Sequence, residues 1–132
     1  MRVVHVAVAV ILDPEGRVLL TRRAEDSHQG GLWEFPGGKV ETEETLAEAL
    51  SREIREELAL EVRASTPLIK VQHDYGDKQV LLDVHLVRQY CGEPVPQEAQ
   101  PMVWAAVGDL GDYLFPAANK PIVELLSRLF DG

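Results

Sequence analysis

Apolar residues lie along the first part of this chain in two runs that predict strands. Residues 3–12 are β-branched and apolar, and residues 18–21 resume the same pattern. The segment between them, residues 13–16, contains aspartate, proline and glycine, which are residues that favour turns. Strands joined by so short a turn commonly pair with each other, so we expect residues 3–21 to form a β-hairpin.

A second group of apolar runs follows in the C-terminal half. Residues 68–73 and 80–90 have strand character and flank a turn at Gly76, and apolar side chains alternate within the second run. A further strand is expected at residues 102–107, after a loop at 92–101 that is rich in polar residues and proline. These runs supply the strands of a sheet.

Two other segments have the spacing of amphipathic helices. Leucine or isoleucine recurs at positions 46, 50, 54 and 58, and Thr45 forms a capping box with Glu48, so a helix is expected from 46 to 58. Apolar residues with helical spacing predict a second helix at 121–130. Strands around one long helix, with another helix at the end, predict an α+β fold, a sandwich with a mixed β-sheet.

The length and charge of the chain restrict its function. With 132 residues it fits a single domain, 1–132, large enough to bury about two-thirds of its unfolded surface in one core. A net charge of −9 argues against binding to a nucleic acid polymer, because such proteins neutralise phosphates with a basic patch. A single nucleotide is compatible with this charge if metal ions bridge the carboxylates and the phosphates.

Cysteine content and hydropathy indicate where such a protein works. Cys91 is the one cysteine, so the chain has no intramolecular disulfide and no cysteine-based zinc site, which suits a reducing cytoplasm. No stretch reaches the roughly 18 successive apolar residues that a membrane-spanning helix needs. We therefore expect a cytoplasmic protein that does not bind membranes, and we also expect a monomer.

Three glutamates of the first helix carry the strongest chemical signal. Glu53, Glu56 and Glu57 stand within one turn of each other, and like charges at this spacing destabilise a helix by roughly 0.3 kcal/mol. Glu57 also lies at the edge of the apolar stripe, where a partly desolvated carboxylate is costly unless it is paired or bound to metal. Mg²⁺ takes oxygen ligands and is commonly held by a few carboxylates together with substrate phosphates. We therefore interpret the helix as a platform for a divalent cation.

The positive residues of the same helix allow a second interpretation. Arg52 and Arg55 are expected to point to other parts of the helical wheel, so they do not offset the three glutamates. The alternative is a solvated surface helix in which Glu48, Arg52 and Glu56 form a ladder of ion pairs. The upstream sequence favours the metal site, because a glycine turn at residues 37–38 leads into the helix and lets the backbone approach a ligand.

The glycines and the helix together resemble the signature box of the Nudix hydrolase family. The match departs at one position, since the family usually has glycine where this chain has Ala59. That position suits a left-handed helix C-terminus, so alanine there is expected to cost about 1 kcal/mol or to change the local exit of the chain. The matching residues are Gly38, Glu44, Arg52, Glu53, Ile54, Glu56, Glu57 and Leu60.

Further stretches resemble the branch of the Nudix family that hydrolyses 8-oxo-dGTP. This resemblance implies a Nudix-like α/β/α sandwich with a mixed β-sheet, one long catalytic helix and a C-terminal helix. It also implies that Mg²⁺, or Mn²⁺ as a substitute, supports attack on the β-phosphorus of 8-oxo-dGTP. The products are 8-oxo-dGMP and pyrophosphate, and a mutagenic nucleotide is kept out of DNA. The resembling stretches are residues 21–24, His28, residues 34–39, residues 92–94, Glu98, residues 115–119 and Pro121.

The resemblance also implies roles for individual residues around the phosphates. Glu53 orients or deprotonates the attacking water, and Glu98 is a second candidate for that role. Arg52 anchors the carboxylate of Glu44, a pairing that suits a planar guanidinium that is always charged. The implied metal ligands are the Gly37 carbonyl, Glu53, Glu56, Glu57 and Glu98.

Four further residues are expected to meet the nucleotide. The side-chain amide of Asn119 is both a donor and an acceptor, so it suits the O6 and the protonated N7 of 8-oxoguanine. Its alternative role is to cap the final helix. By resemblance, Arg23 and His28 contact the nucleotide or its phosphates, and the Phe35 backbone faces the base.

Three alternatives stay open at the level of sequence. A Nudix hydrolase of another nucleotide, a nucleotide sugar or a dinucleoside polyphosphate has the same box, because the box encodes phosphate chemistry and not the base. A non-catalytic domain that recognises 8-oxoguanine belongs to a different class, although such a domain has no need of Glu53, Glu56 and Glu57. The third alternative is that the chain is one domain of a longer polypeptide.

Overall fold

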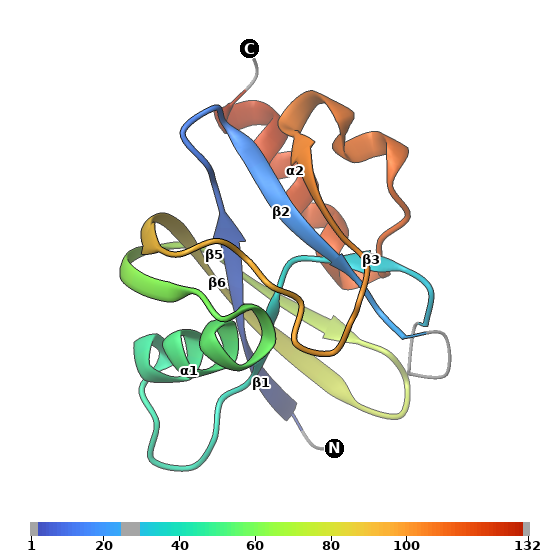
Figure 1. Ribbon diagram of the computed structural model, residues 1–132. Helices are drawn as coiled ribbons and strands as arrows, with labels where there is room; N and C mark the ends of the chain where they lie inside the picture. The colour runs from blue at the N-terminus through green and yellow to red at the C-terminus, as the bar shows by residue number, and fades with distance from the viewer. Residues whose placement is uncertain (1–2, 25–29, 131–132) are drawn as a thin grey trace.

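The computed structural model describes residues 3–24 and 30–130 of the chain. Within these residues the chain forms two β-sheets, two α-helices and two 3₁₀-helices (Figure 1). The four-stranded sheet has the strand order β4-β1-β6-β5, and the three-stranded sheet has the order β3-β2-β7. The predicted α+β class is confirmed.

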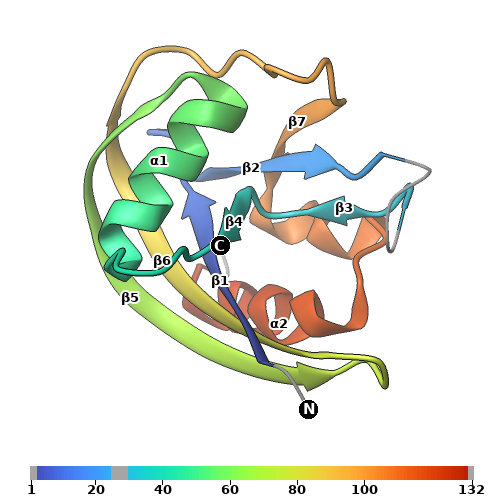
Figure 2. The same ribbon diagram turned by 90° about the horizontal axis from the view of Figure 1, so that it is seen from below.

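The larger sheet is mixed, as the sequence predicts. Its central pair is β1 (Val3–Ile11) and β6 (Gln79–Cys91), which run parallel. β4 (Gly37–Lys39) pairs antiparallel with β1, and β5 (Glu61–Asp74) pairs antiparallel with β6. β5 and β6 are long and curve past both α-helices (Figure 2).

The smaller sheet is antiparallel, and it corrects the predicted hairpin. β2 (Arg17–Arg22) pairs with β3 (Trp33–Glu34) on one edge and with β7 (Met102–Ala106) on the other. β1 and β2 therefore belong to different sheets, and the described residues join them through an isolated bridge between Leu12 and Val18. The hairpin prediction is wrong because β4 and β6 occupy both edges of β1.

The first helix, α1 (Leu46–Leu58), covers one face of the larger sheet. Because side chains alternate along a strand, Ala7, Ala9 and Ile11 of β1 share a face, and they are buried in one cluster with Leu50 and Ile54 of α1. The apolar stripe that the sequence predicts therefore faces this sheet. The predicted bounds of the helix, 46–58, are confirmed.

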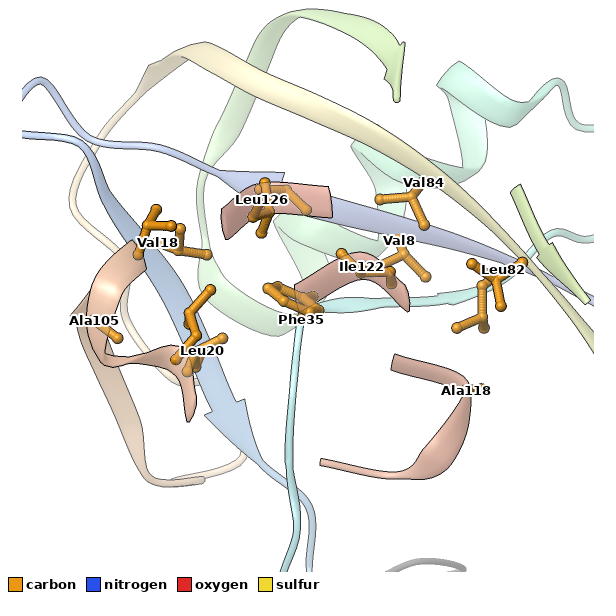
Figure 3. Packing of buried hydrophobic residues seen from close by; sticks show 14 of the residues in the cluster. Val8, Val18, Leu20, Phe35, Leu82, Val84, Ala105, Ala118, Ile122 and Leu126 are labelled. Carbon is orange, nitrogen blue, oxygen red and sulfur yellow. The ribbon is translucent and has the colours of Figure 1, made fainter. Parts of the chain in front are cut away.

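The second helix, α2 (Lys120–Leu129), packs on the opposite face of β1. Ile122 and Leu126 of this helix are fully buried and lie in one cluster with Val8 and Val84 (Figure 3). The 3₁₀-helices η1 (Val107–Asp112) and η2 (Ala117–Asn119) precede α2. In the part of the chain that the structure describes, no helix is long and apolar enough to cross a membrane.

The ends of α1 follow their sequence signals. Thr45 and Glu48 form the predicted capping box, with the Thr45 side chain accepting from the Glu48 N–H. At the other end Ala59 adopts a left-handed backbone with a φ of 57°, and its N–H donates to the Arg55 carbonyl at 3.0 Å. Alanine therefore keeps the geometry that glycine adopts more easily, at a cost of about 1 kcal/mol.

The strand pair formed by β5 and β6 is confirmed as a hairpin, but β5 begins earlier than predicted. It starts at Glu61 rather than at residue 68, and its register against β6 shifts between Val62 and Ile69. Such bulges interrupt the alternation of polar and apolar residues on which strand prediction depends. The strand expected at 102–107 ends at Ala106, one residue early.

Candidate active site

The glycines before α1 bring β4 into close contact with both β1 and the helix. A side chain at Gly37 would overlap the backbone carbonyl of Ala7, and a side chain at Gly38 would overlap the carboxylate of Glu53. The prediction of a glycine turn is wrong, because residues 37–39 form a strand that pairs with β1. Glycine is needed here for close approach of two elements.

Arg52 organises the outer side of α1. Its Nε donates to Glu44 Oε2 at 2.7 Å and its Nη2 donates to Glu44 Oε1 at 2.9 Å, which makes a bidentate ion pair. These bonds, with a backbone hydrogen bond from Glu41, lower the pKa of the Glu44 carboxyl to about 2. The same pairing raises the pKa of Arg52. The contact between Arg52 and Glu44 that the resemblance implied is therefore present.

Arg52 also bonds to two of the helix glutamates. Its Nη1 donates to Glu53 Oε1 at 2.7 Å and to Glu56 Oε1 at 3.0 Å. The prediction that Arg52 points away from them is wrong, because its long side chain folds back over the helix surface. One step of the alternative ladder, Arg52 with Glu56, is present, whereas Glu48 accepts from the Thr45 N–H at the start of the helix.

Glu57 lies on the inner side of the same helix in a different environment. Burial raises the pKa of its carboxyl to about 8, and the negative charges of Glu34, Glu53 and Glu98 act in the same direction. A backbone hydrogen bond with Gly37 opposes the shift. Among the described residues, no positively charged side chain offsets these effects at Glu57, so its environment fits a divalent cation, which takes oxygen ligands.

Glu34 is a site residue that the sequence analysis missed. Burial raises the pKa of its carboxyl, and the guanidinium of Arg23, whose Nη1 donates to Glu34 Oε1 at 2.6 Å, opposes that shift. Glu34 belongs to the two-residue strand β3, and the sequence around it does not indicate that its charge raises the pKa of Glu57. The signal available in the sequence was its place at the start of the resembling stretch 34–39.

The loop at residues 92–101 brings Glu98 to the C-terminal end of α1. The Val95 N–H donates to the Leu58 carbonyl at 2.8 Å, and the Gln97 N–H donates to the Glu57 carbonyl at 2.9 Å. The last carbonyls of a helix have no partner within it, so the loop satisfies them. Glu98, an exposed residue of this loop, is thereby close enough to raise the pKa of Glu57.

The predicted metal ligands lie near one another, but their side chains are not arranged to coordinate a metal ion. Among the described residues, no group of three or more histidine, cysteine, aspartate or glutamate side chains is arranged to hold a metal ion. Arg52 holds Glu53, and the side chain of Glu56 is 59% exposed. The donor set still fits a divalent cation in kind, since every predicted ligand atom is an oxygen. The ligand assignment therefore stays a prediction.

A pocket of about 280 Å³ opens beside Glu57. Val8 and Leu82 contribute apolar walls, and Arg23 and Asn119 contribute polar groups. An apolar pocket with a few polar groups is typical of a site for a small ligand such as a base. A larger groove of about 1000 Å³ lies elsewhere and contains none of the predicted site residues.

The structure bears differently on each of the four residues that are predicted to contact the nucleotide. Asn119 is 9% exposed and precedes α2, but its side chain makes no capping hydrogen bond, so the capping alternative is not supported. Phe35 is buried, lines the pocket and stacks on Phe115 with a centroid distance of 5.3 Å. Arg23 also lines the pocket. His28 lies outside the described residues.

Comparison with known proteins decides the family. The NUDIX domain matches residues 7–125. The chain belongs to the NUDIX domain family. The predicted membership is confirmed, and the helix glutamates with the preceding glycines are the Nudix box. Nudix hydrolases generally use a divalent metal, which agrees with the carboxylate-rich environment of Glu57.

Individual relatives agree with this assignment over nearly the whole Nudix chain. It is 35% identical over 129 residues to the 8-oxo-dGTP diphosphatase of Escherichia coli K12, which covers 98% of this chain and 100% of that protein. It is 34% identical over 129 residues to the CTP pyrophosphohydrolase of the same strain, covering 98% and 95%. A solved MutT structure from work on Aliivibrio salmonicida and Vibrio cholerae has a TM-score of 0.86 and 32% identity, covering 98% and 100%. The expected Nudix fold and the hydrolase class are confirmed.

Proposed function

We propose that this Nudix hydrolase converts 8-oxo-dGTP to 8-oxo-dGMP and pyrophosphate with Mg²⁺, or with Mn²⁺ as a substitute, and so keeps the oxidised nucleotide out of DNA. The observation that carries the proposal is one pocket that is lined by both Asn119 and Glu57. Its apolar walls suit a base, and the carboxylates suit a triphosphate with its cation. The 35% identity to an 8-oxo-dGTP diphosphatase supports the same substrate.

The proposed cation ligands come from three parts of the fold. They are the Gly37 carbonyl on β4, the carboxylates of Glu53, Glu56 and Glu57 on α1, and Glu98 on the following loop. A cation held there neutralises phosphate charge and makes a bound water more acidic. The raised pKa of Glu57 supports this assignment, because a nearby cation stabilises the ionised carboxylate that burial disfavours.

Glu53 is the proposed base for the attacking water. Arg52 fixes its carboxylate through the 2.7 Å bond to Oε1, and Glu44 fixes Arg52 in turn. Glu98 is the second candidate for the base. Attack by water at the β-phosphorus breaks the bond from that phosphorus to the oxygen bridging to the α-phosphorus, and this oxygen leaves with 8-oxo-dGMP.

The base end of the pocket is proposed to distinguish the oxidised purine. The amide of Asn119 accepts from the N7–H of 8-oxoguanine and donates to its O6, whereas guanine has no proton on N7. The Phe35 backbone faces the base, and Arg23 and His28 contact the nucleotide or its phosphates. The ion pair between Arg23 and Glu34 holds the arginine at the pocket wall.

CTP is a second candidate substrate. The 34% identity to a CTP pyrophosphohydrolase is nearly equal to the identity with the 8-oxo-dGTP enzyme, so identity does not separate the two. Both substrates require the same phosphate chemistry. The difference lies in the base, and a pyrimidine has no N7 proton for the Asn119 amide to recognise.

The test is hydrolysis of 8-oxo-dGTP, dGTP and CTP by the purified protein with Mg²⁺, with identification of the products. We expect kcat/KM for 8-oxo-dGTP to exceed the values for the other two by roughly 10²-fold or more, because neither of them offers an N7–H to the carbonyl oxygen of the amide. We expect 8-oxo-dGMP and pyrophosphate as products. Equal turnover of 8-oxo-dGTP and dGTP would contradict the substrate assignment, and preference for CTP would establish the second candidate.

Other sequence predictions stay predictions. These are the single-domain organisation of residues 1–132, the monomeric state and the cytoplasmic location. The non-catalytic alternative has little support, because Glu53, Glu56 and Glu57 are all present and the relatives compared above are named for hydrolysis.

A further inference from the structure

The tip of the β5–β6 hairpin reaches the base end of the pocket. Tyr75 and Lys78 of this tip line the pocket together with Ala118 and Asn119 of η2. The Ala118 N–H donates to Tyr75 Oη at 3.3 Å. This bond joins the hairpin to the segment that carries the proposed base-reading residue.

The hydroxyl of Tyr75 satisfies a backbone group that the short helix does not. Ala118 lies in the first turn of η2, where N–H groups have no acceptor within the helix. Ala118 is 2% exposed, so solvent has little access to this N–H. A buried N–H without an acceptor is destabilising, and the hydroxyl oxygen therefore favours this backbone position.

Tyr75 is itself held by the turn in which it lies. Its N–H donates to the Lys78 carbonyl at 2.9 Å, and the Gly76 N–H donates to Asp74 Oδ1 at 2.7 Å. Its ring meets the ring of His73 edge to face, with the centroids 4.5 Å apart. The hydroxyl is therefore presented to η2 from an ordered turn.

Asn119 directly follows Ala118, so its side chain depends on the same backbone. Its N–H donates to the Pro116 carbonyl at 3.0 Å, and its side chain makes no capping bond to α2. The position of the amide therefore follows the backbone of residues 116–119. A small rotation of this backbone would move the amide relative to a bound base.

We propose that Tyr75 is a positioning residue for base recognition, because its hydroxyl fixes η2 so that Asn119 presents its amide to the base. The proposal rests on the proposed function, in which Asn119 reads the oxidised purine. In this arrangement the ring of Tyr75 forms part of the pocket wall, and the hydroxyl acts through Asn119 on the discrimination between oxidised and ordinary purine.

The variant Tyr75→Phe tests the proposal because it removes the hydroxyl and keeps the ring. We expect KM for 8-oxo-dGTP to rise about three- to tenfold, as for the loss of one hydrogen bond, while kcat changes by less than about twofold. The ratio of kcat/KM for 8-oxo-dGTP to that for dGTP should fall by a similar factor. The matched control is Tyr90→Phe, on β6 against Trp104 and outside the pocket, which should leave the ratio unchanged.

A double-mutant cycle separates positioning from a merely structural role. If Tyr75 acts through Asn119, then Tyr75→Phe added to Asn119→Ala should change the substrate ratio no further. A lower Tm with an unchanged ratio in Tyr75→Phe, or an equal loss in both backgrounds, would overturn the proposal. Wild-type protein without a preference for 8-oxo-dGTP would remove the proposed function and this inference with it, whereas a wild-type preference that Tyr75→Phe retains would overturn the inference alone.

Discussion

The outer and inner sides of α1 place the same side chain in opposite environments. Glu44, just before α1, is bonded at both carboxylate oxygens by Arg52 of the outer side, and its carboxyl pKa is lowered to about 2. Glu57, on the inner side, is partly buried near other carboxylates, and its pKa is raised to about 8. Both glutamates belong to one sequence signature, so residue type alone does not assign their roles.

The two environments distinguish a structural ion pair, that of Arg52 with Glu44, from a candidate binding site at Glu57. A carboxylate bonded by a guanidinium at both oxygens, as Glu44 is, has little to gain from a cation and serves to orient the arginine, whereas Glu53 and Glu56 each give Arg52 a single oxygen. A carboxylate that is buried without such a partner gains most when a cation arrives. Excess negative charge, more than the number of glutamates, therefore marks the position of the expected metal.

The largest expected effect is that of Glu57→Gln. The amide keeps the size of the side chain but carries no negative charge, so we expect weaker Mg²⁺ binding by calorimetry and a loss of roughly 10³-fold in kcat/KM. The control is Glu124→Gln on the exposed side of α2, which should match the wild type. Unchanged Mg²⁺ affinity and activity in Glu57→Gln would show that the inner side is not the metal site.

An intermediate effect is expected for Arg52→Lys on the outer side. Lysine keeps the charge but has no planar fork to bond Glu44 at two atoms while also reaching Glu53, so the catalytic carboxylate loses its orientation. We expect kcat to fall by roughly 10- to 100-fold with a smaller change in Mg²⁺ affinity. Arg55→Lys on the same helix is the matched control. A normal kcat in Arg52→Lys would mean that the network only stabilises the helix.

The smallest effect is expected in the pH dependence of unfolding. Glu57 has a folded-state pKa of about 8, above the ordinary 4.5, so its ionisation should lower the free energy of unfolding as pH rises between these values. Glu44 has a folded-state pKa of about 2, so the stability that it contributes is present above pH 4.5 and is lost as pH falls toward 2.

Mg²⁺ should oppose the loss of stability that Glu57 causes as pH rises. It should not change the loss of stability that Glu44 causes at low pH. In thermal unfolding at pH 8, Mg²⁺ should raise the Tm of the wild type by roughly 3 °C relative to EDTA, with a smaller shift at pH 5. In Glu57→Gln, the shift in Tm caused by Mg²⁺ should be the same at pH 5 and pH 8. An equal Mg²⁺ shift at both pH values would contradict the environment assigned to Glu57.

Local sequence patterns determined several parts of this protein. The period of the apolar stripe and the capping box fixed α1 at 46–58, because both signals act over a few residues of one helix. The spacing of the Nudix box likewise identified the family and the glutamates of α1, since one helix carries most of the box. The contact of Arg52 with Glu44 followed from the same resemblance.

Which groups from different elements lie together became known from the folded structure alone. It placed β1 and β2 in different sheets, because the pairing of a strand depends on which edges its neighbours occupy. It set Glu34 of β3 and Glu98 of a distant loop close enough to raise the pKa of Glu57, and it joined Tyr75 to the segment of Asn119. These effects depend on burial and on distance through space, and a linear sequence specifies neither until the chain has folded.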